Sequence, residues 1–274
     1  MNVQPPARER RVTVRELLEM KRRGERIVVL TAYDVLFARL VDEVADVVLV
    51  GDSLGQVFAG HDSTIPVTLD DMIYHACAVR RGVERALLVV DMPFMTFRVS
   101  PEETLRNAGR IVTESRAEAV KLEGGDADAA RHVRALVRAG IPVMGHVGLT
   151  PQSVHVLGGY RVQGRPAEDA ERLVEDSQRL QDAGAFAIVL ELIPAPLAGR
   201  VSRALEIPTI GIGAGTHTDG QVLVLPDALG LNEAFRPRFL RTFANLAEVA
   251  RAGIASYAAA VRDGSYPDAE HSFE

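Results

Sequence analysis

The chain has 274 residues, 47% of them hydrophobic and 25% charged, which is the balance of an ordinary globular protein. A formal net charge of −6 argues against a dedicated nucleic-acid binder, and the single cysteine, Cys77, excludes an intramolecular disulfide and a multi-cysteine metal site. No apolar run approaches the roughly 18 residues of a membrane span, and the start MNVQPPARERR contains no apolar signal segment, so we expect a cytoplasmic protein with no membrane partner.

Short β-branched runs alternate with helical patterns along the chain. A helical pattern at 14–23 comes first. Two of the runs that follow, DVVLVGD (46–52) and ALLVVDM (86–92), are almost continuously hydrophobic, which is typical of parallel strands buried on both faces. The predicted strands are Ile27–Ala32, Val47–Gly51, Leu87–Met92, Ala119–Glu123, Pro142–Val147, Phe186–Leu192, Pro208–Gly213 and Gln221–Leu225.

Helix start and stop signals stand between these strands. The stretches TLDD (68–71) and SPEE (100–103) each place Ser or Thr three residues before an acid, and the second has proline at the first helical position. Ala-Gly pairs at 139–140 and 183–184 are typical helix ends. Other helices are predicted at Val35–Glu43, Ala127–Ala139, Ala167–Ala183 and Pro196–Ala204, and an amphipathic tract follows at 238–262.

Eight strands with mostly helical connections predict an α/β fold, the (β/α)8 TIM barrel, with an extra N-terminal helix and a C-terminal helical extension. An open doubly wound sheet is the competing architecture. Because the chain shows no internal repeat, low-complexity segment or linker, we expect a single catalytic domain over residues 1–274.

Polar side chains stand where five successive predicted strands end. Since the active site of such a barrel lies at the carboxyl ends of its strands, these side chains are expected to share one site. Lys121 and Glu123 are two apart in one strand, so both point to the same face. The full set is Asp52, Asp91, Lys121, Glu123, His146 and Glu191.

Most of these residues have a plain structural alternative when taken alone, whereas Glu191 is the hardest to explain in that way, because an acid inside VLELI (189–193) has few loop partners nearby. Lys121 and Glu123 could form a buried ion pair, Asp52 and Asp91 could order turns, and His146 could be a core histidine. Taken together, four carboxylates at one site would repel one another unless a cation or protons were present. Oxygen ligands without cysteine or paired histidines favour a hard divalent ion such as Mg²⁺.

The motifs of this chain closely resemble those of the ketopantoate hydroxymethyltransferase family. The resemblance runs in order from about Thr13 to Phe273. It is carried by TAYD (31–34), VGDSLG (50–55), GHDSTIPVT (60–68), YHACAVRRG (74–82), DMPFM (91–95), VKLEGG (120–125), GHVGLTPQSV (145–154), GGYRVQGR (158–165), LELIP (190–194), IGIGAG (210–215), TDGQVLV (218–224) and EHSF (270–273).

The resemblance implies a (β/α)8 barrel and assigns roles to the strand-end residues. One Mg²⁺ per subunit would be held by Asp52, Asp91 and Glu123, and Glu191 matches the family's catalytic base. The positions that would bind substrate are Asp52, Ser53, Asp91, Lys121 and His146. Arg238 stands where lysine is expected in the family, outside the proposed metal site.

The resemblance also implies a reaction and its partners. A hydroxymethyl group would pass from the co-substrate 5,10-methylenetetrahydrofolate to 3-methyl-2-oxobutanoate, giving 2-dehydropantoate for pantothenate synthesis, in a homo-oligomer that is commonly a decamer. The nearest alternative is another Mg²⁺-dependent 2-oxo-acid enzyme of the phosphoenolpyruvate mutase and isocitrate lyase type. A non-catalytic barrel that serves as an assembly scaffold is the alternative from a different class.

Overall fold

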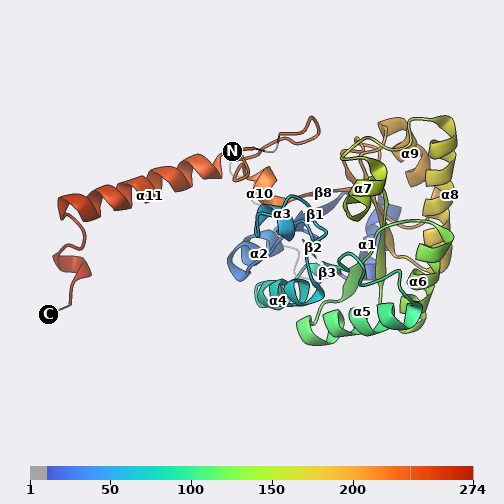
Figure 1. Cartoon of the computed structure of the whole chain (residues 1–274), viewed down its shortest axis with the longest axis horizontal. Helices are drawn as coiled ribbons and strands as arrows, with labels where there is room; N and C mark the ends of the chain where they lie inside the picture. Colours follow the sequence, from blue (N-terminus) through green and yellow to red (C-terminus); the bar gives the residue numbers. More distant parts are fainter. Residues whose placement is uncertain (1–10, 235, 274) are drawn as a thin grey trace. The chain divides into compact units, whose positions relative to one another are not determined.

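The computed structural model describes residues 11–234 and 236–273, so most of the N-terminal stretch MNVQPPARERR lies outside the described residues. Its eight strands pair in sequence order and close into a parallel barrel (Figure 1). The closed barrel confirms the predicted TIM fold and excludes the open sheet. The strands are β1 Ile27–Thr31, β2 Val47–Val50, β3 Leu87–Asp91, β4 Ala119–Lys121, β5 Val143–Gly148, β6 Ala187–Glu191, β7 Thr209–Ile212 and β8 Gly220–Leu223.

The register of neighbouring strands brings the polar strand ends together. Parallel pairing sets Asp91 of β3 opposite Lys121 of β4, and Gly148 of β5 opposite Glu191 of β6. Every residue of β2, β3 and β4 is buried, as their hydrophobic runs predict. Charged residues at the ends of these strands therefore lie next to buried strand residues whose side chains are mostly apolar.

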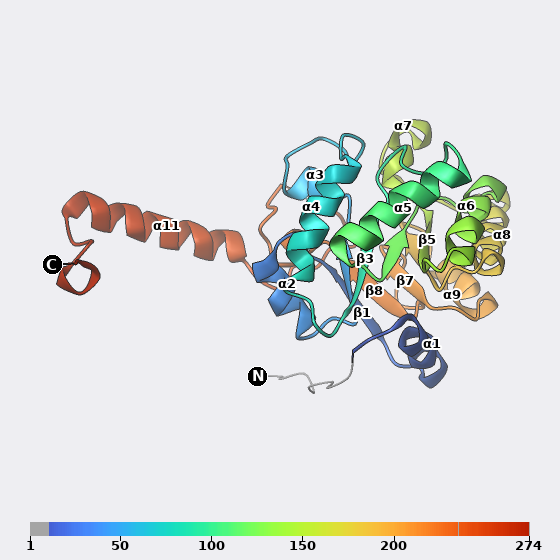
Figure 2. The same ribbon diagram turned by 90° about the horizontal axis from the view of Figure 1, so that it is seen from below.

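Helices surround the barrel in the order of the chain (Figure 2). No helix of the described chain lies between β7 and β8, where residues 213–219 form a loop. The helices that precede or follow strands β1 to β7 are α1 Val14–Arg23, α2 Val35–Asp42, α3 Leu54–Val57, α4 Leu69–Arg80, α5 Pro101–Ser115, α6 Ala127–Arg138, α7 Val154–Leu157, α8 Ala167–Ala183 and α9 Ala195–Ala204.

The predicted helix starts are confirmed by their hydrogen bonds. Thr68 and Asp71 form a complete capping box at the start of α4, each side chain accepting from the other residue's backbone N–H. The Ser100 side chain accepts from Glu103 N at 3.1 Å, and Pro101 occupies the first position of α5. Local signals therefore set these helix boundaries.

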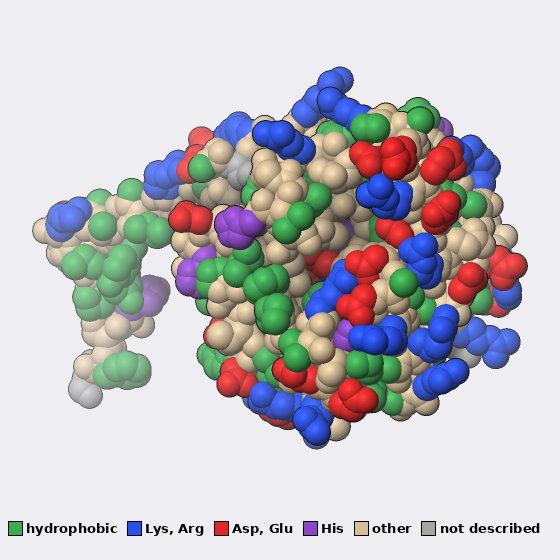
Figure 3. All heavy atoms as spheres, turned by 45° about the vertical axis from the view of Figure 1, so that its right-hand side comes forward, with side chains coloured by type: hydrophobic (Ala, Val, Ile, Leu, Met, Phe, Trp, Pro, Cys, Tyr) green, Lys and Arg blue, Asp and Glu red, His purple; other side chains and the backbone are tan. Residues whose placement is uncertain are grey.

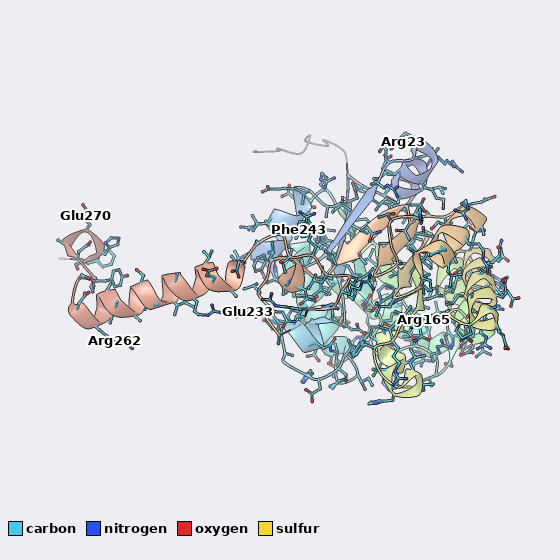
Figure 4. All side chains as sticks on the ribbon, turned by 90° about the horizontal axis from the view of Figure 1, so that it is seen from above. Arg23, Arg165, Glu233, Phe243, Arg262 and Glu270 are labelled. Carbon is cyan, nitrogen blue, oxygen red and sulfur yellow. The ribbon has the colours of Figure 1, made fainter. Side chains whose placement is uncertain are left out.

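Helix α1 closes the N-terminal end of the barrel. Leu17 and Met20 are fully buried there, and they pack in one core cluster with inward-facing residues of the strands. Lys21 donates to the carbonyls of Ser202 and Ile207 and to Asp219. Arg23, at the outer end of the helix, carries its charge toward solvent (Figure 4). The polar strand ends lie at the opposite end of the barrel.

The chain divides into two compact units, Met1–Val224 with the barrel and Leu225–Glu274. The second unit contains α10 Leu225–Ala228 and α11 Leu246–Asp263, with Arg262 near the end of α11 (Figure 4). The predicted tract at 238–262 is helical only from Leu246. Earlier backbone donors bond to α10 instead, with Phe243 N reaching Ala228 O at 2.8 Å. None of the helices in the described chain combines the length and apolarity of a membrane span.

Candidate active site

The polar residues predicted from the strand ends lie together at the carboxyl end of the barrel. Asp52, Asp91, Lys121, Glu123 and His146 are all buried, and Glu191 is partly exposed at the end of β6. On the face drawn in Figure 3, acidic and basic side chains are interspersed with no continuous basic stripe. Beneath this surface, the cluster places a buried lysine beside buried carboxylates.

Lys121 stands at the centre of this cluster. Its Nζ lies 3.0 Å from Asp91 Oδ1 and 3.4 Å from His146 Nδ1. Although β4 ends at Lys121, Leu122 N and Gly124 N still donate to Met144 O and His146 O, so the backbone stays extended. Lys121 and Glu123 consequently face the same side, as their spacing predicts.

Gln152 links two of the carboxylates, although the sequence pattern assigns it no role. Its side-chain amide donates to Asp52 Oδ2 at 2.8 Å and to Met92 O at 3.0 Å, while its backbone N–H donates to Glu123 Oε2 at 3.0 Å. Asp52 is also fixed through its own backbone N–H, which donates to Asp91 Oδ2 at 3.1 Å. The LTPQS motif contains this residue, and only its position in space shows what it contacts.

Glu191 approaches the cluster from the next strand. Its Oε2 lies 3.2 Å from His146 Nε2, and its side chain keeps 16% of its surface exposed. Gly148 permits this approach, because a Cβ on it would stand 2.2 Å from Glu191 O and its φ is +95°. Leu192, which follows Glu191, also has a positive φ of +46°. Backbone strain of this kind, next to a polar strand end, is typical of functional sites.

Two hydroxyl contacts complete the surroundings. Ser53 Oγ lies 2.9 Å from the Tyr33 hydroxyl, which places the TAYD motif beside the end of β2. Gln56 donates to the hydroxyl of Tyr160 at 3.3 Å, so the GGYRVQGR segment reaches the helix that follows Ser53. Tyr33 and Tyr160, like Gln152, belong to motifs of the family whose contacts the sequence does not reveal.

The electrostatics of the cluster are those of crowded, buried acids. Burial and the neighbouring charge of Asp91 raise the pKa of Asp52 to about 7. Burial and the charge of Asp52 also raise the pKa of Glu123 well above its ordinary range. Burial disfavours the charged form of Lys121, but the carboxylates of Asp91, Glu123 and Asp52 outweigh it, so the pKa of Lys121 lies above its usual value.

His146 responds in the opposite direction. Burial, reinforced by the charge of Lys121, lowers the pKa of His146 below its usual value. A neutral ring that accepts from Lys121 at Nδ1 carries its proton on Nε2, which faces Glu191. Lysine, imidazole and carboxylate are therefore arranged in a row from β4 to β6.

The donor chemistry of Asp52, Asp91 and Glu123 fits a hard divalent ion. All three offer carboxylate oxygens, and burial together with the neighbouring carboxylates disfavours the charged forms of Asp52 and Glu123, which a cation would favour. Within the described residues, however, no three His, Cys, Asp or Glu side chains already converge on a common point as metal ligands. Gln152 contacts one oxygen of Asp52 and one of Glu123, and Lys121 lies against one oxygen of Asp91.

A family model described as "Ketopantoate hydroxymethyltransferase" matches residues 11–269. The chain belongs to the ketopantoate hydroxymethyltransferase family. It is 54% identical over 266 residues to the 3-methyl-2-oxobutanoate hydroxymethyltransferase of Syntrophotalea carbinolica, covering 97% of this chain and 99% of that one. It is 51% identical to the enzyme of the same name from Chlorobium luteolum, covering 100% of both chains. The family prediction is confirmed, and the chain is a transferase enzyme.

Solved structures share the fold at much lower identity. A 2,3-dimethylmalate lyase of the phosphoenolpyruvate mutase and isocitrate lyase superfamily matches with a TM-score of 0.60 and 18% identity, over 94% of this chain and 91% of that one. A phosphonopyruvate hydrolase, solved with oxalate and Mg²⁺, matches with a TM-score of 0.59 and 13% identity, over 95% and 93%. These likenesses confirm the barrel architecture.

Proposed function

We propose that this enzyme transfers a hydroxymethyl group from 5,10-methylenetetrahydrofolate to 3-methyl-2-oxobutanoate, with water, to give 2-dehydropantoate. The observation that carries the proposal is the buried row of Lys121, His146 and Glu191 beside three carboxylates, in a chain of this family. The chemical difficulty of the reaction is the weak acidity of the substrate C3–H beside its ketone, and each part of this row addresses it.

Asp52, Asp91 and Glu123 are the residues that would hold one Mg²⁺, consistent with their oxygen-only donor set. When bound, the ion supplies positive charge to the keto oxygen and stabilises the enolate that forms as the C3 proton leaves. Lys121 adds a fixed positive charge for the substrate carboxylate. Ser53, at the end of β2 with its hydroxyl held by Tyr33, donates a hydrogen bond to the same substrate.

Glu191 acts as the base that takes the C3 proton. Its side chain is the one in the row with a substantial exposed fraction, so substrate can reach it. The neutral His146 ring lies beside the Glu191 carboxylate, with Nε2 3.2 Å from Oε2, and adds no positive charge there. The nucleophilic C3 atom then forms a bond to the methylene carbon of methylenetetrahydrofolate. Both C–N bonds of that carbon break, water provides the hydroxyl oxygen of the product, and tetrahydrofolate leaves with the C3 proton and one water proton on its two nitrogens.

Replacement of Glu191 tests this assignment directly. We expect Glu191→Gln to slow the Mg²⁺-dependent exchange of the substrate C3 proton in deuterated water, followed by NMR, by about 10²-fold or more. Its Mg²⁺ affinity should stay unchanged, because Glu191 is not a proposed ligand. Glu168→Gln, on the exposed surface of α8, removes the same charge and should exchange normally. Normal exchange in Glu191→Gln would exclude Glu191 as the base.

Folate dependence separates this function from the alternatives. An enzyme of the phosphoenolpyruvate mutase and isocitrate lyase type needs no folate, so product formation only with methylenetetrahydrofolate excludes it. A scaffold would form no product at all. We further propose a cytoplasmic homo-oligomer, with the decamer suggested by family resemblance, and sedimentation of the purified enzyme measures its size.

A further inference from the structure

Four arginines line an open pocket at the N-terminal end of the barrel, away from the carboxylate cluster. The pocket has a volume of about 440 Å³, within the range of small-ligand sites, and its lining residues are Arg11, Arg80, Arg81 and Arg116. Arg80 and Arg81 end α4, and Arg116 follows α5. A hydrogen bond of 2.8 Å from Val12 N to Arg85 O fixes the segment carrying Arg11 beside them.

The acids around this pocket are already engaged. Glu118 uses one oxygen for Arg80, at 2.9 Å, and for Arg11, and its other oxygen accepts from Leu88 N at 3.0 Å. Asp42 accepts from the backbone N–H groups of residues 84–86. Among the described residues, Arg81 and Arg116 form no ion pair. Two guanidinium groups of the pocket are therefore left without a carboxylate from the described chain.

Positive charge accumulates here beyond what local structure neutralises. The ends of α4 and α5 contribute about half a negative charge each, and Glu118 and Asp42 contribute one each, against four guanidinium groups. Burial lowers the pKa of Arg80, and the nearby charges of Arg11 and Arg116 lower it further against the opposing effect of Asp42. The pocket therefore carries a net positive charge, which a bound anion would neutralise.

Arg116 is held in a conformation that suits glycine better. It caps α5 in the left-handed region, with φ of +60° and ψ of +31°. Glycine adopts this conformation without a Cβ penalty, whereas arginine incurs steric strain there. The backbone turn therefore does not require arginine at position 116, and what arginine adds there is its guanidinium group.

We propose that this arginine pocket binds a small anion with more than one phosphate group. Guanidinium groups bind phosphate oxygens in pairs, and several arginines facing one open pocket suit adjacent phosphates better than a single monovalent ion. The site lies at the end of the barrel opposite Asp52 and Glu191, so it is separate from the proposed catalytic function and its test does not depend on that function.

Isothermal titration of the full-length enzyme with inorganic pyrophosphate, in EDTA, tests the proposal. We expect saturable binding of one ion per chain, at least tenfold weaker in Arg81→Gln/Arg116→Gly. Glycine at 116 relieves the backbone strain, so this variant should fold. The matched control is Arg134→Gln/Arg138→Gln, which removes two exposed arginines from α6 and should bind like the wild type.

Three results would overturn the proposal. The first is no saturable binding of pyrophosphate to the wild-type enzyme. The second is a loss of affinity that is equal in the two double variants, which would show that binding responds to overall charge. The third is binding that survives intact in Arg81→Gln/Arg116→Gly, which would place the anion elsewhere, for example near Lys121 at the catalytic end.

Discussion

At the scale of single residues, Gln152 shows how a neutral side chain can organise charged ones. It holds Asp52 through its amide and Glu123 through its backbone N–H, although these residues come from different strand ends. Residues that orient metal ligands typically affect metal affinity or activity by about 10–100-fold when replaced. At the proposed metal site, Gln152 would position both acids for an ion.

We therefore expect Gln152→Ala to weaken Mg²⁺ binding by about tenfold, because Asp52 loses the donor that fixes its oxygen while Glu123 keeps its backbone contact. Titration calorimetry with Mg²⁺ measures the change. Gln163→Ala is the matched control, since the side-chain amide of Gln163 donates to the nearby Arg161 carbonyl and not to a carboxylate of the described chain. Unchanged affinity in Gln152→Ala would remove Gln152 from this role.

At the scale of elements, the ends of β5 and β6 approach each other so closely that only glycine fits at position 148, the last residue of β5. A Cβ on Gly148 would meet the backbone carbonyl of Glu191 at 2.2 Å, and a backbone atom cannot rotate aside as a side chain can. The same approach brings His146 of β5 within 3.2 Å of Glu191. The close spacing of these two strand ends therefore also sets the distance between His146 and Glu191.

Gly148→Ala should destabilise the protein by about 2 kcal/mol or more, because left-handed strain is added to a backbone clash. Urea unfolding gives the free energy of unfolding. Gly140→Ala separates the two causes, since Gly140 has a φ of +87° but nothing within 4 Å of the added Cβ. A similar loss in both variants would mean that strain alone acts and that the clash is relieved.

At the scale of the whole molecule, the crowded acids link stability to pH. The pKa of Asp52 is raised from 3.8 to about 7 in the folded protein, so between these values the folded state holds a proton that the unfolded chain has released. Without metal, the contribution of Asp52 to stability is full below about pH 4 and is lost as the pH rises through about 7. A pKa that differs by one between the folded and unfolded states corresponds to about 1.4 kcal/mol.

The melting temperature of the metal-free enzyme should therefore fall between pH 5 and pH 8. Excess Mg²⁺ should reverse the fall at pH 8, since an ion at about 100 times its Kd adds about 2.7 kcal/mol. Thermal unfolding in EDTA and in Mg²⁺ measures both effects. Asp52→Asn should flatten the pH dependence, although not completely, because the pKa of Glu123 is raised as well. An unaltered fall in Asp52→Asn would contradict this account.

The sequence by itself determined the barrel, its helix caps and which polar residues meet at the carboxyl ends of its strands. Strand runs such as DVVLVGD and capping residues such as Thr68 and Ser100 act through neighbours a few residues away, so their effect can be predicted from the sequence. The alternation of side chains along a strand likewise predicts that Lys121 and Glu123 face the same way. These are local rules, and the fold obeys them.

Only the tertiary structure decided what those residues touch. Gln152 and Asp52 are 100 positions apart, Glu118 reaches Arg11 across 107, and the start of α11 depends on backbone bonds back to α10. No local pattern encodes such contacts, because they arise when eight strands close and bring distant loops to the same end. Local sequence preferences set which segments form helices and strands, whereas closure of the barrel sets which residues of those segments come into contact.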